Sequence, residues 1–289
     1  MTDRAQHVGF VGLGAIGAPL AESLVRAEVP VVVYDLDAAA VDRLVAAGAE
    51  AAGSLADLGA RVRLVGVCVP ADAHVRAVLG GPDGLLGNLA AGSVVAIHST
   101  VLPETVQWAA EAAAAYGIAV VEAAVTGGAA AASEGRSTFL LGGDPAAIEQ
   151  LAPLLDACGD VCIHAGELGQ ASRLKLCINL QSYANFMGVF EASMLAKKLG
   201  LPLEALKTAM RANGQLSEMT GNYMLLNDLS DADLANPGTR QFLEGYAAII
   251  EKDLDLIVRL ADEAGVPVPT AELAGQLARR VYFLEAPNP

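Results

Sequence analysis

An α/β fold is predicted, in which a doubly wound parallel sheet is followed by an all-helical C-terminal domain. From residue 7 to about 165, short β-rich runs alternate with helical segments, as in parallel sheets built from strand–helix–strand units. A glycine-rich turn follows the first of these runs, and the β-rich runs stop after Gly166. We therefore place the two domains at residues 1–165 and 166–289.

The expected strands are short runs rich in valine and isoleucine: Val8–Val11, Val31–Tyr34, Leu64–Val67, Val94–Ile97, Ala119–Glu122, Thr138–Leu141 and Val161–His164. Helices are expected between them at Ala18–Ala27, Ala38–Ala47, Glu104–Tyr116 and Pro145–Asp156. Beyond the sheet, one long helix is expected from Leu168 to about Leu199, because Gly200 and Pro202 end it. Shorter helices are expected at Leu203–Ala212, Glu244–Ala264 and Thr270–Leu284.

The turn after the first strand has the spacing Gly-x-Gly-x-x-Gly. The first glycine permits a tight turn, the second lets the backbone approach a pyrophosphate, and the third lets the next helix pack closely on the strand. The free N–H groups at the start of that helix then face the anion. The pattern indicates a Rossmann-type dinucleotide site whose first binding residues are Gly12, Leu13, Gly14, Ala15, Ile16 and Gly17.

Asp35 follows the second strand, about 20 residues after the glycine turn. A carboxylate there accepts hydrogen bonds from the adenosine ribose hydroxyls and repels a 2′-phosphate, which usually requires an arginine. The residues that follow, Leu36, Asp37 and Ala38, supply no cation, so we predict NAD rather than NADP. The alternative is that Asp35 or Asp37 only caps the helix that begins near Ala38.

Ligands of doubly wound sheets bind beyond the carboxyl ends of the strands. Val69 and Pro70, Ser99 and Thr100, and the segment Thr126-Gly127-Gly128 all follow predicted strands and therefore share a rim with the glycine turn. A hydroxyl followed by two glycines exposes backbone N–H groups that suit a small carboxylate. A flexible glycine turn is the alternative interpretation of Thr126, Gly127 and Gly128.

Lys175 is the strongest candidate for proton transfer. It lies early in the long helix among apolar residues, and Asn179 follows four positions later on the same face. Apolar surroundings disfavour the charged form of a lysine and so lower its pKa toward a range useful for catalysis. The alternative is that Lys175 is a surface lysine and Asn179 a solvated amide. The pair Lys252-Asp253, in a later helix, is by itself typical of a solvated face.

Composition excludes several classes of protein. The net charge of −15 argues against a nucleic-acid surface. The sequence contains no run of 18 uncharged apolar residues, so no membrane span is predicted. We expect a cytoplasmic protein. The cysteines form no CxxC pair and the histidines no HExxH motif, so no metal site is expected. The four cysteines are interpreted as buried small apolar residues; they are Cys68, Cys158, Cys162 and Cys177.

Together these motifs resemble those of the β-hydroxyacid dehydrogenases, the group that contains 3-hydroxyisobutyrate dehydrogenase and tartronate semialdehyde reductase and is related to 6-phosphogluconate dehydrogenase. The resemblance covers nearly the whole chain. It is carried by five ordered segments, which are Gly9 to Gly17, Ser99-Thr100, Glu122 to Gly128 with Glu134-Gly135, Gly166-x-x-Gly169 leading to Lys175 and Asn179, and Lys252-Asp253-Leu254.

The resemblance implies roles for individual residues. Lys175 matches the catalytic lysine of the family, which exchanges the proton of the substrate hydroxyl, and Asn179 matches an amide that holds the substrate. Thr126, Gly127 and Gly128 match the carboxylate-binding segment. Thr100 and Lys252 match positions near the nicotinamide end of the cofactor. The implied protein is an NAD-dependent oxidoreductase of small β-hydroxy acids, 3-hydroxyisobutyrate-like, that forms homodimers or homotetramers.

Several positions depart from the family pattern. The substrate segment usually reads Asp-x-Pro-Val-Ser-Gly-Gly, whereas this chain has Glu122, Ala124 and Thr126 at the matching places. Ile97 and His98 stand where the family commonly has an aspartate and an apolar residue, and Leu180 replaces a second asparagine. A structural role is the more favoured interpretation of His98, with a ligand contact as the alternative. An imine reductase, or a protein that senses dinucleotide without turnover, stays open as another function.

Overall fold

The computed structural model describes residues 7–285, and the outer ends of the two predicted domains, residues 1–6 and 286–289, lie outside them. The described chain forms two compact units, the first ending at Lys175 and the second beginning at Leu176. The division falls inside the helix α9 (Gln170–Lys198), so that Lys175 belongs to the first unit and Asn179 to the second.

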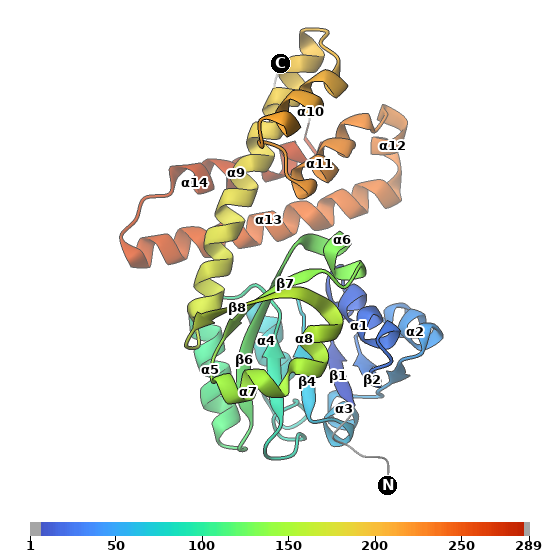
Figure 1. The fold of residues 1–289 in the computed structure, drawn as a ribbon, viewed down its shortest axis with the longest axis vertical. Coiled ribbons are helices and arrows are strands. Elements are labelled where there is room, and N and C mark those ends of the chain that lie inside the picture. Colours follow the sequence, from blue (N-terminus) through green and yellow to red (C-terminus); the bar gives the residue numbers. More distant parts are fainter. Residues whose placement is uncertain (1–6, 286–289) are drawn as a thin grey trace. The chain divides into compact units, whose positions relative to one another are not determined.

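The first unit is an eight-stranded sheet with the order β3-β2-β1-β4-β5-β6-β7-β8 (Figure 1). The strands are β1 (Val8–Val11), β2 (Val31–Tyr34), β3 (Glu50–Ala51), β4 (Leu64–Val67), β5 (Val94–Ile97), β6 (Ala119–Thr126), β7 (Ser137–Gly142) and β8 (Gly159–Gly166). Five of the predicted strands were placed within one residue of each end, but β6 and β8 are longer than predicted and β3 was not predicted.

Alternating side chains of the strands enter two separate apolar cores, as expected for a sheet covered on both faces. Phe10 and Val33 pack in the core beneath α1 (Gly17–Arg26), α2 (Ala38–Ala47), α7 (Pro145–Gln150) and α8 (Ala152–Cys158). Val11 and Val32 pack on the other face, beneath α3 (Leu55–Arg61), α4 (Asp72–Leu79) and α5 (Pro103–Ala114). The sheet is therefore doubly wound, as the sequence predicts.

The sheet is not parallel throughout. β6 pairs with β7 in the antiparallel sense, while β7 and β8 are parallel to one another. The connection between β6 and β7 runs from Gly127 to Arg136 and contains only the short helix α6 (Gly128–Ser133). It is shorter than the dozen or so residues that a parallel crossover requires. This short connection makes the expectation of a fully parallel sheet wrong at its last two strands.

The second unit is all-helical within the described residues. After α9 it contains α10 (Leu203–Ala212), α11 (Glu218–Met224), the 3₁₀ helix η1 (Leu225–Asp228), α12 (Asp231–Ala235), α13 (Pro237–Ala264) and α14 (Pro269–Val281). α10 matches its predicted bounds, whereas α13 begins seven residues earlier than expected because Asn236 caps it, accepting hydrogen bonds from the N–H groups of Gly238 and Thr239.

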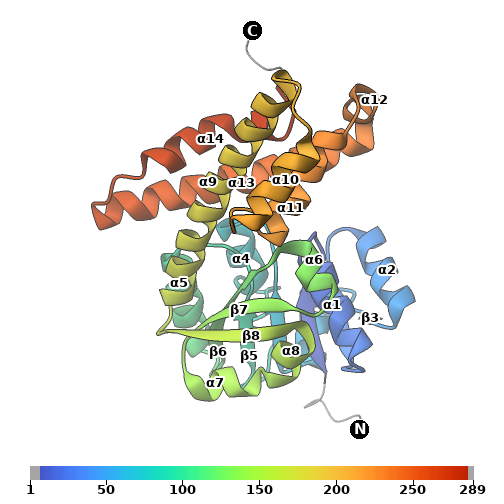
Figure 2. The ribbon, with the colours of Figure 1, turned by 45° about the horizontal axis from the view of Figure 1, so that its top comes forward.

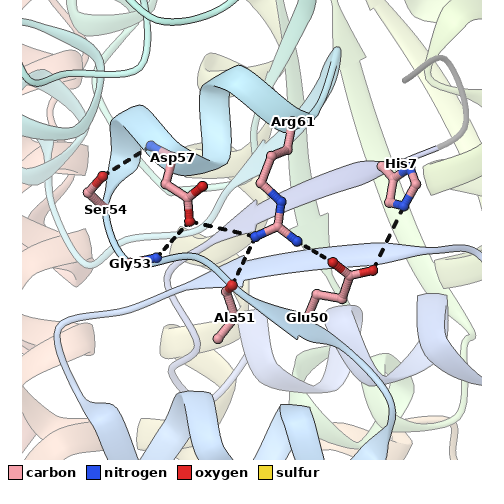
Figure 3. Close-up of polar contacts among 7 residues, drawn as sticks. All are labelled: His7, Glu50, Ala51, Gly53, Ser54, Asp57 and Arg61. Carbon is pink, nitrogen blue, oxygen red and sulfur yellow. Dashed lines mark hydrogen bonds and ion pairs between the residues drawn. The ribbon is translucent and has the colours of Figure 1, made fainter. Parts of the chain in front are cut away.

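The edge strand β3 is held by a polar network at its amino end (Figure 3). Arg61, at the end of α3, pairs with Glu50 and donates to the Ala51 carbonyl at 3.0 Å. The same guanidinium lies 3.6 Å from the carboxylate of Asp57, and His7 lies 4.0 Å from Glu50. The network ties a strand of two residues, at the edge of the sheet, to the helix that follows it.

The cysteines do not share one environment. Cys158 is buried on α8 and donates to the Leu20 carbonyl, and burial raises the pKa of its thiol to about 12. Cys162 lies on β8, which is an exposed edge strand, and Cys177 lies on an outward position of α9. The expectation of buried cysteines is therefore wrong for Cys162, because β8 has a neighbouring strand on one side only, and for Cys177, which is exposed on α9.

Candidate functional site

The glycine turn between β1 and α1 has the geometry that a dinucleotide requires. A Cβ at Gly12, whose φ is +91°, would lie 2.2 Å from the Cys68 carbonyl oxygen, and a Cβ at Gly17 would lie 1.9 Å from the Gly12 carbonyl oxygen. A Cβ at Gly14 would instead meet nothing within 4 Å. The first and third glycines thus allow close backbone packing, while the second leaves open the space that a pyrophosphate would fill.

The turn is anchored to the strands on both sides of β1. The Gly12 N–H donates to the Tyr34 carbonyl at 3.1 Å, and the Cys68 N–H donates to the Val11 carbonyl at 2.8 Å. Leu13, Ala15 and Ile16 complete the loop between Gly12 and Gly17, with Leu13 buried. The six predicted residues of the turn therefore lie together at the carboxyl ends of β1, β2 and β4.

Asp35 lies at the end of β2 and faces this turn. Its carboxylate accepts from the Leu13 N–H at 2.5 Å and from the Asp37 N–H at 2.8 Å. Asp37 is the residue that caps α2, accepting from the Ala39 N–H. The capping alternative is therefore correct for Asp37, whereas Asp35 joins β2 to the glycine turn.

A cavity of about 330 Å³ opens beside Asp35. Its walls include two carboxylates, those of Asp35 and Asp42, and no lysine or arginine; the lining residues are Tyr34, Asp35, Leu36, Ala38, Val41, Asp42, Ala52 and Gly53. A group that carries extra negative charge meets two acids and no cation there.

The other predicted residues of the first unit extend the same rim. Val69 and Pro70 follow β4, and the Val69 N–H donates to the Ser99 hydroxyl at 2.8 Å. Thr100 follows β5, next to Ser99. Thr126 ends β6, and Gly127 and Gly128 follow it with φ angles of +110° and +75°.

The turn at Gly127 and Gly128 is held against the helix of the glycine turn. α6, which begins at Gly128, lies beside α1 in both ribbon views (Figure 1, Figure 2). The Ser23 hydroxyl donates to the Ala132 carbonyl at 3.0 Å, and Arg26 donates to the Ser133 carbonyl at 2.6 Å. The candidate carboxylate-binding segment and the candidate cofactor-binding helix are thus joined within one unit.

Lys175 is the sixth residue of α9 and is half-buried. The start of this helix is fixed by Glu122, which lies on β6 and accepts hydrogen bonds from Gly169, Ala171 and Ser172. Glu122 appears in the sequence as a departure from the family pattern, and its capping role was not predicted. Its separation from α9, 47 residues to Gly169, hides the pairing from any local pattern.

In the second unit, Asn179 and Lys252 meet at one buried carboxylate. The Asn179 amide nitrogen donates to Asp253 Oδ2 at 2.8 Å, and the Tyr183 hydroxyl donates to the same oxygen at 2.5 Å. The Lys252 ammonium lies 2.8 Å from Asp253 Oδ1. Burial, followed by the charge of Asp253, raises the pKa of Tyr183 well above its ordinary range, so its hydroxyl stays a donor.

This cluster corrects the interpretation of Asp253 as part of a solvated face, because only 2% of the residue is exposed. Tyr183 and Asp253 were missed as partners of Asn179. The signal for Tyr183 was its position four residues after Asn179, on the same face of the helix. Because a carboxylate only accepts, the cluster also fixes the orientation of the Asn179 amide.

His98 has a structural position. Its ring stacks on Phe10 at a centroid distance of 5.6 Å, and Nδ1 donates to the Ala123 carbonyl at 2.8 Å. Nε2 is buried without a hydrogen-bond partner. Burial lowers the pKa of His98 to about 4, a shift that the Ala123 hydrogen bond opposes. The structural interpretation of His98 is therefore correct.

No group of three or more histidine, cysteine or acidic side chains in residues 7–285 is arranged to hold a metal ion. None of the helices in that range is both long and apolar enough to span a bilayer.

Two protein-family profiles match the chain in succession. Residues 7–166 match the NAD binding domain of 6-phosphogluconate dehydrogenase, and residues 169–283 match the NAD-binding region of NADP-dependent 3-hydroxyisobutyrate dehydrogenase. The first profile thus covers the β-rich part of the sequence, and the second covers the helical part.

Curated relatives align over almost the whole chain. The NAD-dependent L-serine dehydrogenase of Pseudomonas aeruginosa is 35% identical, with 95% of this chain and 91% of that protein covered. The 3-hydroxyisobutyrate dehydrogenase of the same organism is 32% identical, with 99% and 93% covered. The crystal structure of 3-hydroxyisobutyrate dehydrogenase from Salmonella typhimurium matches with a TM-score of 0.84, 30% identity and coverage of 95% and 93%.

The buried, neutral His98 generates a prediction for stability. An unfolded chain protonates this histidine near pH 6.5, whereas the folded chain does so only near pH 4. The unfolded state thus binds the extra proton between these values, so stability falls as pH falls from about 6.5 to 4, by roughly 3 kcal/mol in total. Urea unfolding at several pH values should show a shallower dependence in His98→Asn than in the wild type.

The matched control for this measurement is His74→Asn, which changes an exposed histidine of α4. It should keep the pH dependence of the wild type. Parallel curves for the wild type and His98→Asn across this range would contradict the assignment.

Proposed function

Because the chain belongs to the β-hydroxyacid dehydrogenase family of NAD(P)-dependent oxidoreductases, we propose that it oxidises a small β-hydroxy acid with NAD, or reduces the matching aldehyde or keto acid. The observation that carries the proposal is that the glycine turn, the Thr126-Gly127-Gly128 segment and the start of α9 belong to one unit, in which Glu122 joins β6 to α9. The relatives that act on L-serine and on 3-hydroxyisobutyrate suggest the size and charge of the substrate.

We propose that the Gly12–Gly17 turn holds the pyrophosphate and that Asp35 accepts from the ribose hydroxyls. Support comes from the open space at Gly14 and from the carboxylates beside it. Val69, Pro70 and Thr100 would complete the binding surface along the same rim. The resemblance assigns Lys252 to the nicotinamide end, where its ammonium lies 2.8 Å from the Asp253 carboxylate. When bound, NAD supplies the acceptor for the hydride that leaves the carbinol carbon.

In this proposal, Thr126, Gly127 and Gly128 bind the substrate carboxylate through a hydroxyl and backbone N–H groups. The positive φ angles of both glycines support this, since a side chain at either position would be strained. A fixed carboxylate orients the carbinol carbon for transfer. Thr126 keeps the hydroxyl of the usual serine and adds a methyl group, which makes this segment a point where substrate choice is set.

We propose that Lys175 takes the proton of the substrate hydroxyl during oxidation and returns it during reduction. Asn179 follows one turn later on α9. Its amide nitrogen gives one of its two N–H groups to Asp253, which leaves the second N–H to donate to the substrate hydroxyl oxygen, whose proton Lys175 takes. Tyr183 and Asp253 then serve to hold the amide in this orientation.

The experiment that tests the proposal is NADH formation by the purified protein across a panel of small 3-hydroxy acids that includes 3-hydroxyisobutyrate and L-serine. NADP is run in parallel. Turnover of one acid with NAD is the expected result. No turnover on the panel, despite measurable NADH binding, would contradict the proposal, and a cyclic imine assay would then test the imine reductase alternative.

Lys175→Met should lower kcat by about 10³-fold or more, because general acid–base catalysis is lost while the fold is retained. NADH affinity, measured by fluorescence titration, should stay within about twofold of the wild type because the cofactor turn is untouched. Lys198→Met is the matched control, since it removes an exposed lysine from the other end of the same helix. Near-normal turnover in Lys175→Met would remove Lys175 from this role.

Asp35→Ala should raise the ratio of kcat/KM with NADP to that with NAD by about tenfold, because the charge that repels a 2′-phosphate is removed. Asp37→Ala is the comparison: it should cost about 1 kcal/mol of stability as a lost helix cap and leave the cofactor ratio unchanged. An unchanged ratio in Asp35→Ala, or the same change in both variants, would contradict the assignment of NAD preference.

We also propose that the protein is a homodimer or homotetramer. The helical unit exposes several large apolar side chains that contact with another copy would bury; they are Leu195, Leu199, Leu201, Leu225, Phe242, Ile249, Val266 and Leu273. Light scattering on the purified protein should give two or four times the 29.5 kDa of one chain. The mass of a single chain at micromolar concentration would contradict this.

A further inference from the structure

Glu122 is a buried carboxylate that the proposed chemistry does not use. Only 1% of the residue is exposed, and it lies in the middle of β6 between Ile97 on one neighbouring strand and Gly142 on the other. Oε2 accepts from the Gly169 N–H at 2.6 Å and from the Ala171 N–H at 3.3 Å. Oε1 accepts from the Ser172 N–H at 2.8 Å and from the Ser172 hydroxyl at 2.5 Å.

These donors belong to the first turn of α9. The first N–H groups of any helix lack partners within the helix, and a carboxylate near them is further stabilised by the helix dipole. Several other helices satisfy this need locally, as α2 does with Asp37 and α7 with Asp144. α9 instead takes its cap from a strand 47 to 50 residues earlier in the chain.

The surrounding backbone is shaped to admit this side chain. A Cβ at Gly142 would lie 2.3 Å from Glu122 Oε2, so only glycine leaves room for the carboxylate. Gly169 has a φ of +92°, which turns its N–H toward Glu122 just before α9 begins. A charge buried this deeply is stabilised only if its oxygens are fully hydrogen-bonded, and here both are.

The cap fixes the start of α9 to the strand that carries the proposed carboxylate-binding segment. Thr126 lies four residues after Glu122 on β6, about 13 Å along the strand. Lys175 lies three residues after Ser172, about 4.5 Å along the helix. Glu122, Thr126 and Lys175 all belong to the first unit, so the height and rotation of Lys175 relative to Thr126 depend on this one carboxylate.

We propose that Glu122 is a positioning residue for Lys175, holding the first turn of α9 at the height on β6 where the lysine meets the hydroxyl of a carboxylate-bound substrate. The inference rests on the proposed function, because it assigns the proton transfer to Lys175. A cap within α9 would satisfy the same N–H groups but would move with the helix, whereas a cap on β6 sets the helix in the frame of the substrate.

The test compares Glu122→Gln, Glu122→Asp and the wild type. The amide of Glu122→Gln accepts at one atom only and turns a donor toward the helix N–H groups. The kcat for the acid identified in the panel should fall about 10- to 100-fold, the scale expected for a displacement of about 1 Å. NADH affinity should stay within about twofold. Glu122→Asp keeps a carboxylate and should recover most of the lost kcat.

The matched control is Asp144→Asn, which weakens the cap of α7 in the same unit, where Asp144 accepts from the Ala146 N–H at 2.7 Å. It should lower stability without lowering kcat. Retention of kcat in Glu122→Gln, or a loss of kcat in Asp144→Asn at equal loss of stability, would overturn the proposal.

A second readout does not depend on turnover. Acetic anhydride acetylates exposed lysines, and peptide mass spectrometry measures the rate at each one. Acetylation of Lys175 should be at least about threefold faster in Glu122→Gln than in the wild type, because the first turn of α9 opens more often without its cap. Hydrogen exchange of residues 169–175 should be faster for the same reason. Acetylation of Lys198 should be unchanged. Equal acetylation rates of Lys175 in the variant and the wild type would overturn the proposal for Glu122. This outcome can be seen even if no panel acid is turned over, so failure of the Glu122 proposal is distinguishable from failure of the proposed function.

Discussion

The hydrogen bonding of the Glu122 carboxylate is the constraint on which the arrangement of this protein depends. A helix of 29 residues cannot begin inside a protein unless its first N–H groups find acceptors. Here the acceptors come from the middle of the sheet, and the room for them comes from Gly142. Two residues on the paired strands β6 and β7, Glu122 and Gly142, therefore decide where α9 starts and which residues occupy its second turn.

The glycine turn imposes the same kind of constraint at the carboxyl end of β1. Gly12 and Gly17 are required because carbonyl oxygens occupy the space of a side chain, and Gly14 because that space must stay open. Asp35 then accepts from the Leu13 N–H, so the loop is held in shape by the strand that follows it. The candidate cofactor-binding surface is thus held in shape largely by backbone contacts within the chain, and a preformed surface of this kind lowers the ordering cost of binding.

Much of this could be predicted from the sequence because it depends on local patterns. The strands β1, β2, β4 and β5 are runs of apolar residues bounded by polar or glycine-rich segments, and they lie at the predicted bounds. The direction of β7 could not be obtained in this way, because it depends on the length of the connection from β6 rather than on the composition of the strand.

The candidate site shows the same division. The spacing of Gly12, Gly14 and Gly17 is local, and so is that of Lys175 and Asn179. The partners of Asn179 and of the α9 backbone are distant, since Asp253 is 74 residues from Asn179 and Glu122 is 50 from Ser172. Periodicity identifies which residues share a helix face, but it carries no information on which buried acid a polar group will meet, because that is decided by packing.

In the proposed function, a chain with 33 acidic and 18 basic residues binds two anions, the cofactor and the acid. Asp253 is neutralised by the Lys252 ammonium and two neutral donors, and Glu122 by backbone N–H groups and a hydroxyl. Their negative charge is thereby compensated locally. In the proposed function the cofactor and the acid are bound mainly by neutral donors, at Gly14 and at Thr126 to Gly128. Binding through oriented N–H groups depends on geometry more than on net charge, so the overall acidity of the surface and an anionic substrate are compatible.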